Sequence, residues 1–277
     1  MAEITAAAVK SLRDRTDLPM MQCKKALVEA GGDEEQAIAI LAEKMRVKVK
    51  SRDDNEAKEG QIFIEAKEDG SELAVVELRC ESEPVSKSEG FATLGHALVK
   101  QLLTGPGANE PSELLAQSDA NGSLKDQFED VNTKIQEKFD LARVARHTAP
   151  CGVYVHHNGK VAAVFCADAE SGEADKAVLQ DVAMHIAAMR PVATTVEDLP
   201  AESVAAERTR LTEEAKASGK PENIVEKIVE GQMRKYYKED AGVLVEQAFA
   251  KDDSKSVGQV LKENGLKARH FDLFVIG

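Results

Sequence analysis

Three stretches at the start of the chain space their apolar residues three and four positions apart, which is typical of short amphipathic helices. A glycine pair at positions 31–32 gives the backbone freedom that the end of the second helix needs. Asp33 then stands where a side chain caps the third. The apolar positions are Ile4, Ala8, Val9 and Leu12, then Met21, Ala26, Leu27 and Ala30, then Ala37, Ile38, Leu41 and Met45. Residues 1–52 are predicted to form a three-helix domain. The basic run at 44–52 is predicted to be a solvated linker, because acidic residues follow it directly, and a basic nucleic-acid patch is the alternative.

The middle of the chain changes to the alternating pattern of strands. Residues 61–67 and 73–80 flank a turn, and an irregular acidic loop and a helix over 91–103 follow. Residues 152–156 and 161–167 flank Asn158 and Gly159, which favour a tight hairpin turn, and a helix over 176–189 follows. The repeated plan predicts two related α+β core subdomains, residues 53–147 and 148–277. A chance likeness between two ordinary hairpin–helix units is the alternative.

The segments around these units are less regular. Residues 104–120 are rich in Gly, Pro, Ser and Asn, which predicts a loop, and a helix over 128–139 leads into a strand over 140–146. Two charged helical stretches, 203–217 and 223–239, are separated by a Gly–Pro break. They predict an antiparallel helical hairpin inserted at about 200–240 in the second subdomain. A short helix and a returning strand over 257–277 complete an α+β fold.

Composition narrows the function. The chain has 277 residues, with 36 Lys and Arg against 49 Asp and Glu, so its net charge is −13. Phosphate repulsion makes such a chain a poor candidate for direct nucleic-acid binding. The 4 cysteines form no CxxC pair, so we expect no zinc site and reduced thiols in a cytoplasmic protein. The N-terminus lacks a targeting pattern and no apolar run is long enough to span a bilayer, so no membrane association is expected.

Catalytic chemistry has little support in the sequence. No phosphate-binding glycine loop, GxSxG or HExxH motif occurs. His156 and His157 are neighbours that would point to opposite faces of a strand, so they should not share a metal. His185 is expected to be a satisfied core histidine, and the acidic residues at 81–83 a solvated loop. We therefore expect a binding protein and not an enzyme, with no cofactor and no metal.

Two segments carry a family resemblance. LRDRTDLPMMQCKKAL at 12–27 and GKPENIVEKIVEGQMRKYY at 219–237 closely resemble the elongation factor Ts family. The resemblance implies a translation elongation factor of protein biosynthesis, the guanine-nucleotide exchange factor for elongation factor Tu. It also implies that residues 1–52 are a ubiquitin-associated-like (UBA-like) docking domain, that the core has two parts, and that the helical hairpin is a coiled coil.

The same resemblance assigns residues that would bind the partner: Arg13, Met20 and Met21 in the first segment, and His156 in the second hairpin. Adaptable methionine side chains suit a groove that changes shape. Two alternatives stay open, because Met21 could simply be helix core and His156 an ordinary surface histidine. Asp17 and Pro19 stand where relatives usually have glycine.

The last element that the resemblance implies is a loop that displaces magnesium in the partner. Relatives usually carry a Thr-Asp-Phe-Val run there, and this chain has Ser82, Glu83, Pro84 and Val85. Glu83 keeps a negative charge, whereas Pro84 lacks the aromatic ring. The expected function is binding to elongation factor Tu, in its GDP-bound and nucleotide-free forms, with promotion of GDP release so that GTP can reload. The alternative is a non-catalytic or chaperone-like partner of the same GTPase. A homodimer through the helical hairpin is left open.

Overall fold

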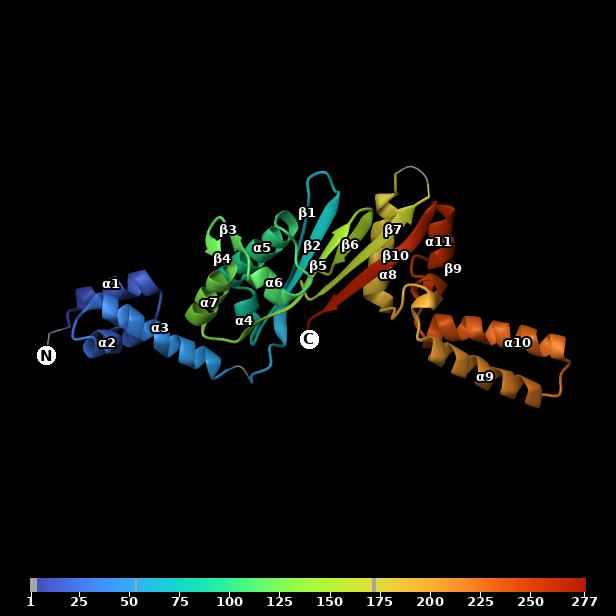
Figure 1. Ribbon diagram of the computed structural model, residues 1–277, viewed down its shortest axis with the longest axis horizontal. Coiled ribbons are helices and arrows are strands. Elements are labelled where there is room, and N and C mark those ends of the chain that lie inside the picture. The colour runs from blue at the N-terminus through green and yellow to red at the C-terminus, as the bar shows by residue number, and fades with distance from the viewer. Residues whose placement is uncertain (1–3, 53, 171–172) are drawn as a thin grey trace. The chain divides into compact units, whose positions relative to one another are not determined.

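The structure is a computed structural model that describes residues 4–52, 54–170 and 173–277 (Figure 1). Helices and small sheets are mixed, so the predicted α+β class is confirmed. The chain forms two compact units. The first contains Met1–Ala66, Ala74–Arg146 and Ile276–Gly277, and the second Lys67–Leu73 and His147–Val275. The three-part division into 1–52, 53–147 and 148–277 stays a prediction.

The three-helix domain predicted from the apolar spacing is present in the first unit. Its helices are α1 (Ala6–Thr16), α2 (Met20–Glu29) and α3 (Glu34–Lys50). The Gly32 N–H donates to the Leu27 carbonyl over 2.8 Å and ends α2, while the Asp33 carboxylate caps α3. The core is the apolar set Val9, Leu12, Leu18, Cys23, Ala26, Leu27, Ala30, Ala37, Leu41 and Met45. The linker predicted at 44–52 is wrong, because α3 continues through it to Lys50.

The first sheet has the strand order β1-β2-β5. Its strands are β1 (Glu59–Ala66), β2 (Glu72–Cys80) and β5 (Phe139–Thr148). Its helices are α4 (Glu83–Ser86), α5 (Glu89–Thr104), α6 (Pro111–Leu115) and α7 (Leu124–Ile135). Alternate residues of β2 join the core with the α5 side chains. Gly95 of α5 allows close packing, since a Cβ there would lie 2.2 Å from the Phe63 ring.

The second sheet is antiparallel with the order β10-β7-β6. It contains β6 (Cys151–Val155), β7 (Val161–Ala169) and β10 (Leu266–Val275), and it packs against α8 (Lys176–Met189). Smaller elements complete this unit: η1 (Val196–Asp198), η3 (Leu244–Glu246), β8 (Ala248–Phe249), β9 (Asp252–Ser256) and α11 (Val257–Glu263). Phe165, Leu179 and Ile186 are fully buried between the sheet and α8.

The helical hairpin consists of α9 (Ala201–Ala217) and α10 (Glu222–Lys235), and α10 continues into a π-helical turn, η2 (Tyr236–Asp240). Figure 1 shows the two helices side by side and connected by a short turn. Leu211, Ala215, Val225, Val229 and Met233 form their shared apolar seam. A narrow seam with charged outer faces is typical of coiled-coil packing.

Three expectations about local structure need correction. The loop predicted at 104–120 contains α6 and enters β3 (Ser118–Asp119), which pairs with β4 (Gly122–Ser123). The acidic loop after β2 contains the one-turn helix α4. Two of the four cysteines are not free thiols, because Cys151 and Cys166 face each other in β6 and β7 and form a disulfide. Directly opposed residues in antiparallel strands lie close enough for such a bond.

Candidate functional site

The corner between α1 and α2 presents apolar side chains to solvent. Met20 is 45% exposed and Met21 is 63% exposed, although both stand in the first turn of α2. Cys23 and Leu27 of the same helix are buried. The interpretation of Met21 as helix core is therefore wrong. Exposed methionines are flexible apolar groups that suit a protein-binding surface.

Arg13 lies in the last turn of α1, near this corner in the sequence. Its side chain is about half exposed, and its guanidinium lies 3.4 Å from the Asp14 carboxylate. Its carbonyl accepts a hydrogen bond from the Asp17 N–H over 2.8 Å. Asp17 closes the helix with φ at 55°, in the left-handed region that glycine adopts most easily. Glycine would adopt this conformation with less strain than aspartate.

The segment from Ser82 to Val85 divides into anchored and exposed residues. Glu83 and Pro84 are exposed at the start of α4, where a proline fits because the first helical N–H groups need no partner. The Lys87 ammonium pairs with the Glu83 carboxylate over 2.7 Å. Val85 packs against the core cluster and Ser86 is buried. A single helical turn thus presents one acidic and one apolar side chain on a buried base.

Ser82 is the anchor at the other end of this segment. Its N–H and its hydroxyl both donate to the carboxylate of Glu137, over 3.1 and 2.7 Å. The buried thiol of Cys80 donates to the Ser82 carbonyl over 3.3 Å. Burial and the neighbouring Glu137 charge raise the pKa of Cys80 to about 12, so this thiol stays protonated and unreactive at neutral pH.

His156 lies directly after the end of β6, in the second unit. Its Nδ1 lies 2.9 Å from the Tyr154 hydroxyl, which fixes the ring on the strand that precedes it. The rings of His156 and His157 are 4.2 Å apart, so the expectation that they point to opposite faces is wrong. Strand alternation stops at Val155, and both histidines belong to the turn. Within the described residues, no group of three or more His, Cys, Asp or Glu side chains could hold a metal ion.

His185 is confirmed as a satisfied core histidine. Its Nδ1 accepts from the Ala250 N–H over 3.1 Å, so its Nε2 carries the proton and donates to the Gln247 side-chain oxygen over 3.0 Å. Burial lowers the pKa of His185, and the hydrogen bond to Gln247 opposes that shift. The histidine is therefore neutral, and hydrogen bonds within the core occupy both of its ring nitrogens.

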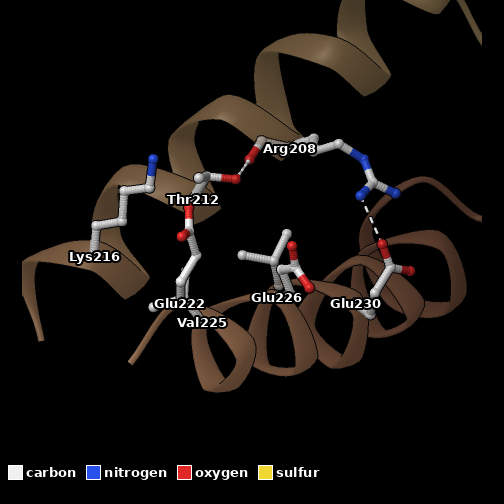
Figure 2. A pocket seen from close by; sticks show the side chains of 8 residues that line it. Arg208, Thr212, Lys216, Glu222, Val225, Glu226 and Glu230 are labelled. Atoms are coloured by element: carbon white, nitrogen blue, oxygen red, sulfur yellow. Dashed lines mark hydrogen bonds and ion pairs between the residues drawn. The ribbon is translucent and has the colours of Figure 1, made fainter. Parts of the chain in front are cut away.

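A groove of about 380 Å³ lies between the two helices of the hairpin (Figure 2). The Arg208 guanidinium of α9 pairs with the Glu230 carboxylate of α10 over 2.6 Å across it. The Thr212 hydroxyl donates to the Arg208 carbonyl over 2.7 Å. The ion pair joins the two helices, whereas the Thr212 hydrogen bond lies within α9, and these groups form no pair of nucleophile and base. In the part of the chain that the structure describes, no helix is both long and apolar enough to cross a membrane.

Sequence reasoning identified the exposed corner and the Ser82–Val85 segment, but it missed Glu137. This residue is 55 positions from Ser82, and no sequence pattern relates the two. The only signal available was its place just before a predicted strand, where a carboxylate can reach the end of a neighbouring strand.

The chain is thus a mixed helix-and-sheet protein with an exposed helical corner and a helical hairpin. The family model for Elongation factor TS matches residues 81–277. The chain is 39% identical to elongation factor Ts of Hyphomonas neptunium, over 100% of this chain and 93% of that protein. It is 38% identical to elongation factor Ts of Aquifex aeolicus, over 97% and 96%. It is 37% identical to that of Thiobacillus denitrificans, over 100% and 93%.

The chain belongs to the elongation factor Ts family. Membership makes it a translation elongation factor of protein biosynthesis, and an exchange-factor role is consistent with this family.

Proposed function

We propose that this protein binds elongation factor Tu and accelerates the release of its GDP, so that GTP can reload. The observation that carries the proposal is the corner at residues 12–27, where Met20 and Met21 stay exposed in the first turn of a helix whose residues Cys23, Ala26 and Leu27 are buried. An exposed apolar pair on a packed domain supports a docking role for this corner. Arg13 and His156 are proposed as further contacts with the same partner.

The mechanism is thermodynamic linkage. A factor that binds the nucleotide-free GTPase more tightly than the GDP-bound form must weaken GDP binding by the same ratio. GDP is held in such GTPases by charge-assisted contacts to phosphate and by magnesium, so disturbing either contact loosens the nucleotide. This mechanism needs no cofactor and no covalent chemistry in the factor, which is why we class the protein as a binding factor and not an enzyme.

The exchange step is assigned to Ser82, Glu83, Pro84 and Val85. Ser82 and Val85 are held by Glu137 and by the core, which leaves Glu83 and Pro84 to meet the partner. A carboxylate placed near a bound magnesium ion would compete for it or for its ligands. The proposed role of Glu83 is this disturbance, and the proposed role of Pro84 is a rigid apolar contact next to it.

A second candidate is a non-catalytic or chaperone-like partner of elongation factor Tu. It is favoured by Pro84, because an exposed proline ring offers less flat surface than the phenylalanine that relatives usually have. Binding would persist in this case, but GDP release would not be accelerated.

One experiment separates the two. Elongation factor Tu is loaded with fluorescent GDP and mixed with this protein and excess unlabelled GDP, and the release rate is followed by stopped flow. Exchange activity predicts a rate that rises with protein concentration and then saturates. Titration calorimetry under the same conditions measures binding. Binding without acceleration would reject the exchange role and favour the second candidate.

A comparison of variants tests the division of roles. Glu83→Ala should slow exchange at saturation by about tenfold while changing the Kd less than threefold, because the residue is exposed and supports no core packing. Equal losses in both quantities would mean that Glu83 serves docking alone. The proposed homodimer through α9 and α10 is tested by sedimentation at several protein concentrations.

A further inference from the structure

Glu81 directly follows β2 and precedes the exchange loop, and its carboxylate accepts three hydrogen bonds. Its Oε1 accepts from the Lys138 N–H over 2.6 Å. Its Oε2 accepts from the Arg52 guanidinium over 2.7 Å and from the Asn55 amide over 2.9 Å. The carboxylate is thus shared between the sheet and the segment that leaves the three-helix domain.

The contact with Lys138 is one half of a reciprocal pair. Glu81 accepts from the N–H of Lys138, while Glu137 accepts from the N–H of Ser82. The end of β2 and the start of β5 are therefore clasped by two carboxylates, each of which holds the backbone of the other strand. Charge-assisted bonds of this kind are short and strong. The first residue of the exchange loop is fixed by this clasp.

The contacts with Arg52 and Asn55 connect the clasp to the three-helix domain. The Ser51 N–H donates to the Val47 carbonyl and the Asn55 N–H donates to the Arg52 carbonyl, so the chain after α3 remains hydrogen-bonded. The Lys138 ammonium donates to the Asn55 carbonyl over 2.9 Å. In addition, α3 packs against α7, where the Lys48 ammonium donates to the Gln136 side chain.

The charge of Glu81 persists in this setting. Burial by itself would raise the pKa of Glu81, but the Lys138 N–H and the Arg52 guanidinium outweigh it, and the pKa is lowered. The Glu81 side chain is only 17% exposed, so water screens its ion pair with Arg52 less than it screens a pair on the open surface. The electrostatic attraction within this pair is therefore stronger than in an exposed pair.

We infer that Glu81 is a positioning residue that transmits docking of the three-helix domain to the exchange loop, through Arg52 and Asn55 on one side and Ser82 on the other. The inference rests on the proposed exchange function. Binding at Met20 and Met21 restrains the position of α3, and Arg52 follows the end of α3. The ion pair between Arg52 and Glu81 then keeps the loop in the position that presents Glu83. A loop without this pair would still belong to a docked protein, but it would be in that position for a smaller fraction of the time.

The test removes the cation and leaves the loop itself intact. Arg52→Ala should lower the saturating GDP-release rate by about tenfold, with less than a twofold change in Kd for elongation factor Tu. Arg52→Lys keeps the charge and should stay within about threefold of the unmodified protein. The matched control is Lys255→Ala, which breaks an ion pair of 2.6 Å with Glu263 in the second unit and should leave both quantities unchanged.

Hydrogen–deuterium exchange gives a second measurement that does not depend on GDP release. In Arg52→Ala the amides of Ser82 and Ser86 should exchange about tenfold faster, while those of α1 and α2 remain as in the unmodified protein. Equal loss of affinity and rate, or unchanged protection of Ser82 and Ser86, would overturn the inference. If the unmodified protein binds without accelerating GDP release, the exchange function fails, and amide protection of the loop in the complex still decides whether Glu81 transmits docking.

Discussion

Gly152 is the position in β6 where a single methyl group should disturb the second unit most. A Cβ there would lie 2.2 Å from the carbonyl carbon and oxygen of Leu179 and 2.6 Å from the Gln180 nitrogen. These atoms are the backbone of α8, which cannot turn aside as a flexible side chain can. The helix and the strand would have to separate by roughly 1 Å before the contacts reached ordinary van der Waals distance.

The expected cost of Gly152→Ala is about 2 kcal/mol, the usual range for overpacking a well-filled core. In a unit of this size, that loss lowers Tm by about 8 °C. Gly231→Ala is the matched control, because Gly231 is an exposed helical glycine with no atom within 4 Å of a Cβ. Alanine favours the helix there, so stability should rise by about 0.8 kcal/mol. The two glycine-to-alanine substitutions in the same unit are therefore expected to change the free energy of unfolding in opposite directions.

Both variants are measured by urea and thermal unfolding followed by circular dichroism. The midpoint for Gly152→Ala should fall and the midpoint for Gly231→Ala should rise, with m-values unchanged. A Gly152→Ala protein as stable as the unmodified one would refute the close approach of β6 to α8. Because β6 ends next to His156, the same variant should also weaken binding to elongation factor Tu if this histidine is a contact.

Three further outcomes are expected. Asp17→Gly should stabilise the three-helix domain by about 1 kcal/mol, because φ at 55° strains a residue with a Cβ, and Asp17→Ala should not, as thermal unfolding of the two variants would show. Met20→Ala and Met21→Ala should each weaken binding about tenfold by calorimetry without lowering Tm, since both side chains are exposed; a lower Tm would indicate a core role. Burial lowers the pKa of His185 in the folded protein below the value of about 6.5 that it has in the unfolded chain. The contribution of the neutral histidine to the free energy of unfolding is therefore complete above that value and is lost as the pH falls below it. Urea midpoints at pH 7.5 and 5.5 should therefore differ more in the unmodified protein than in His185→Gln, and equal differences would exclude this contribution.

Much of the fold follows from local chemistry. The helix at 176–189 has the bounds of α8, because Asp175 caps its start and Arg190 ends it in the left-handed conformation before Pro191. The hairpins were predictable because Gly70 and Gly159 adopt the positive φ that their turns require. The two-residue strands β3, β4 and β8 were not, since segments this short show no period.

The candidate site likewise contains features that the sequence could predict and features that depend on tertiary structure. Helical periodicity alone did not predict the exposed methionines, because Met20 has the i, i+3 and i+7 spacing with the buried Cys23 and Leu27. Nor could the sequence decide on which side Met21 lies. The contacts of Glu81 and Glu137 depend on tertiary structure. They join residues between 26 and 57 positions apart. The pairing of β2 with β5 brings Glu81 to Lys138 and Ser82 to Glu137, whereas Arg52 and Asn55 come from the segment before β1. Local propensity contains no information about such pairs.

The arrangement around residues 81–86 explains why this chain can depart from its relatives there and keep the same fold. Ser82 is bound through its backbone and hydroxyl to Glu137, and Val85 and Ser86 are held against the core. Only Glu83 and Pro84 are exposed, so changes at these two positions alter what the loop presents and not where it lies. Pro84→Phe should therefore change the rate of GDP release while leaving Tm within about 2 °C, because the position lies in the first turn of α4 and its side chain is exposed. A large fall in Tm would show that Pro84 helps to hold the loop, and the separation between anchoring and presenting residues would then be wrong.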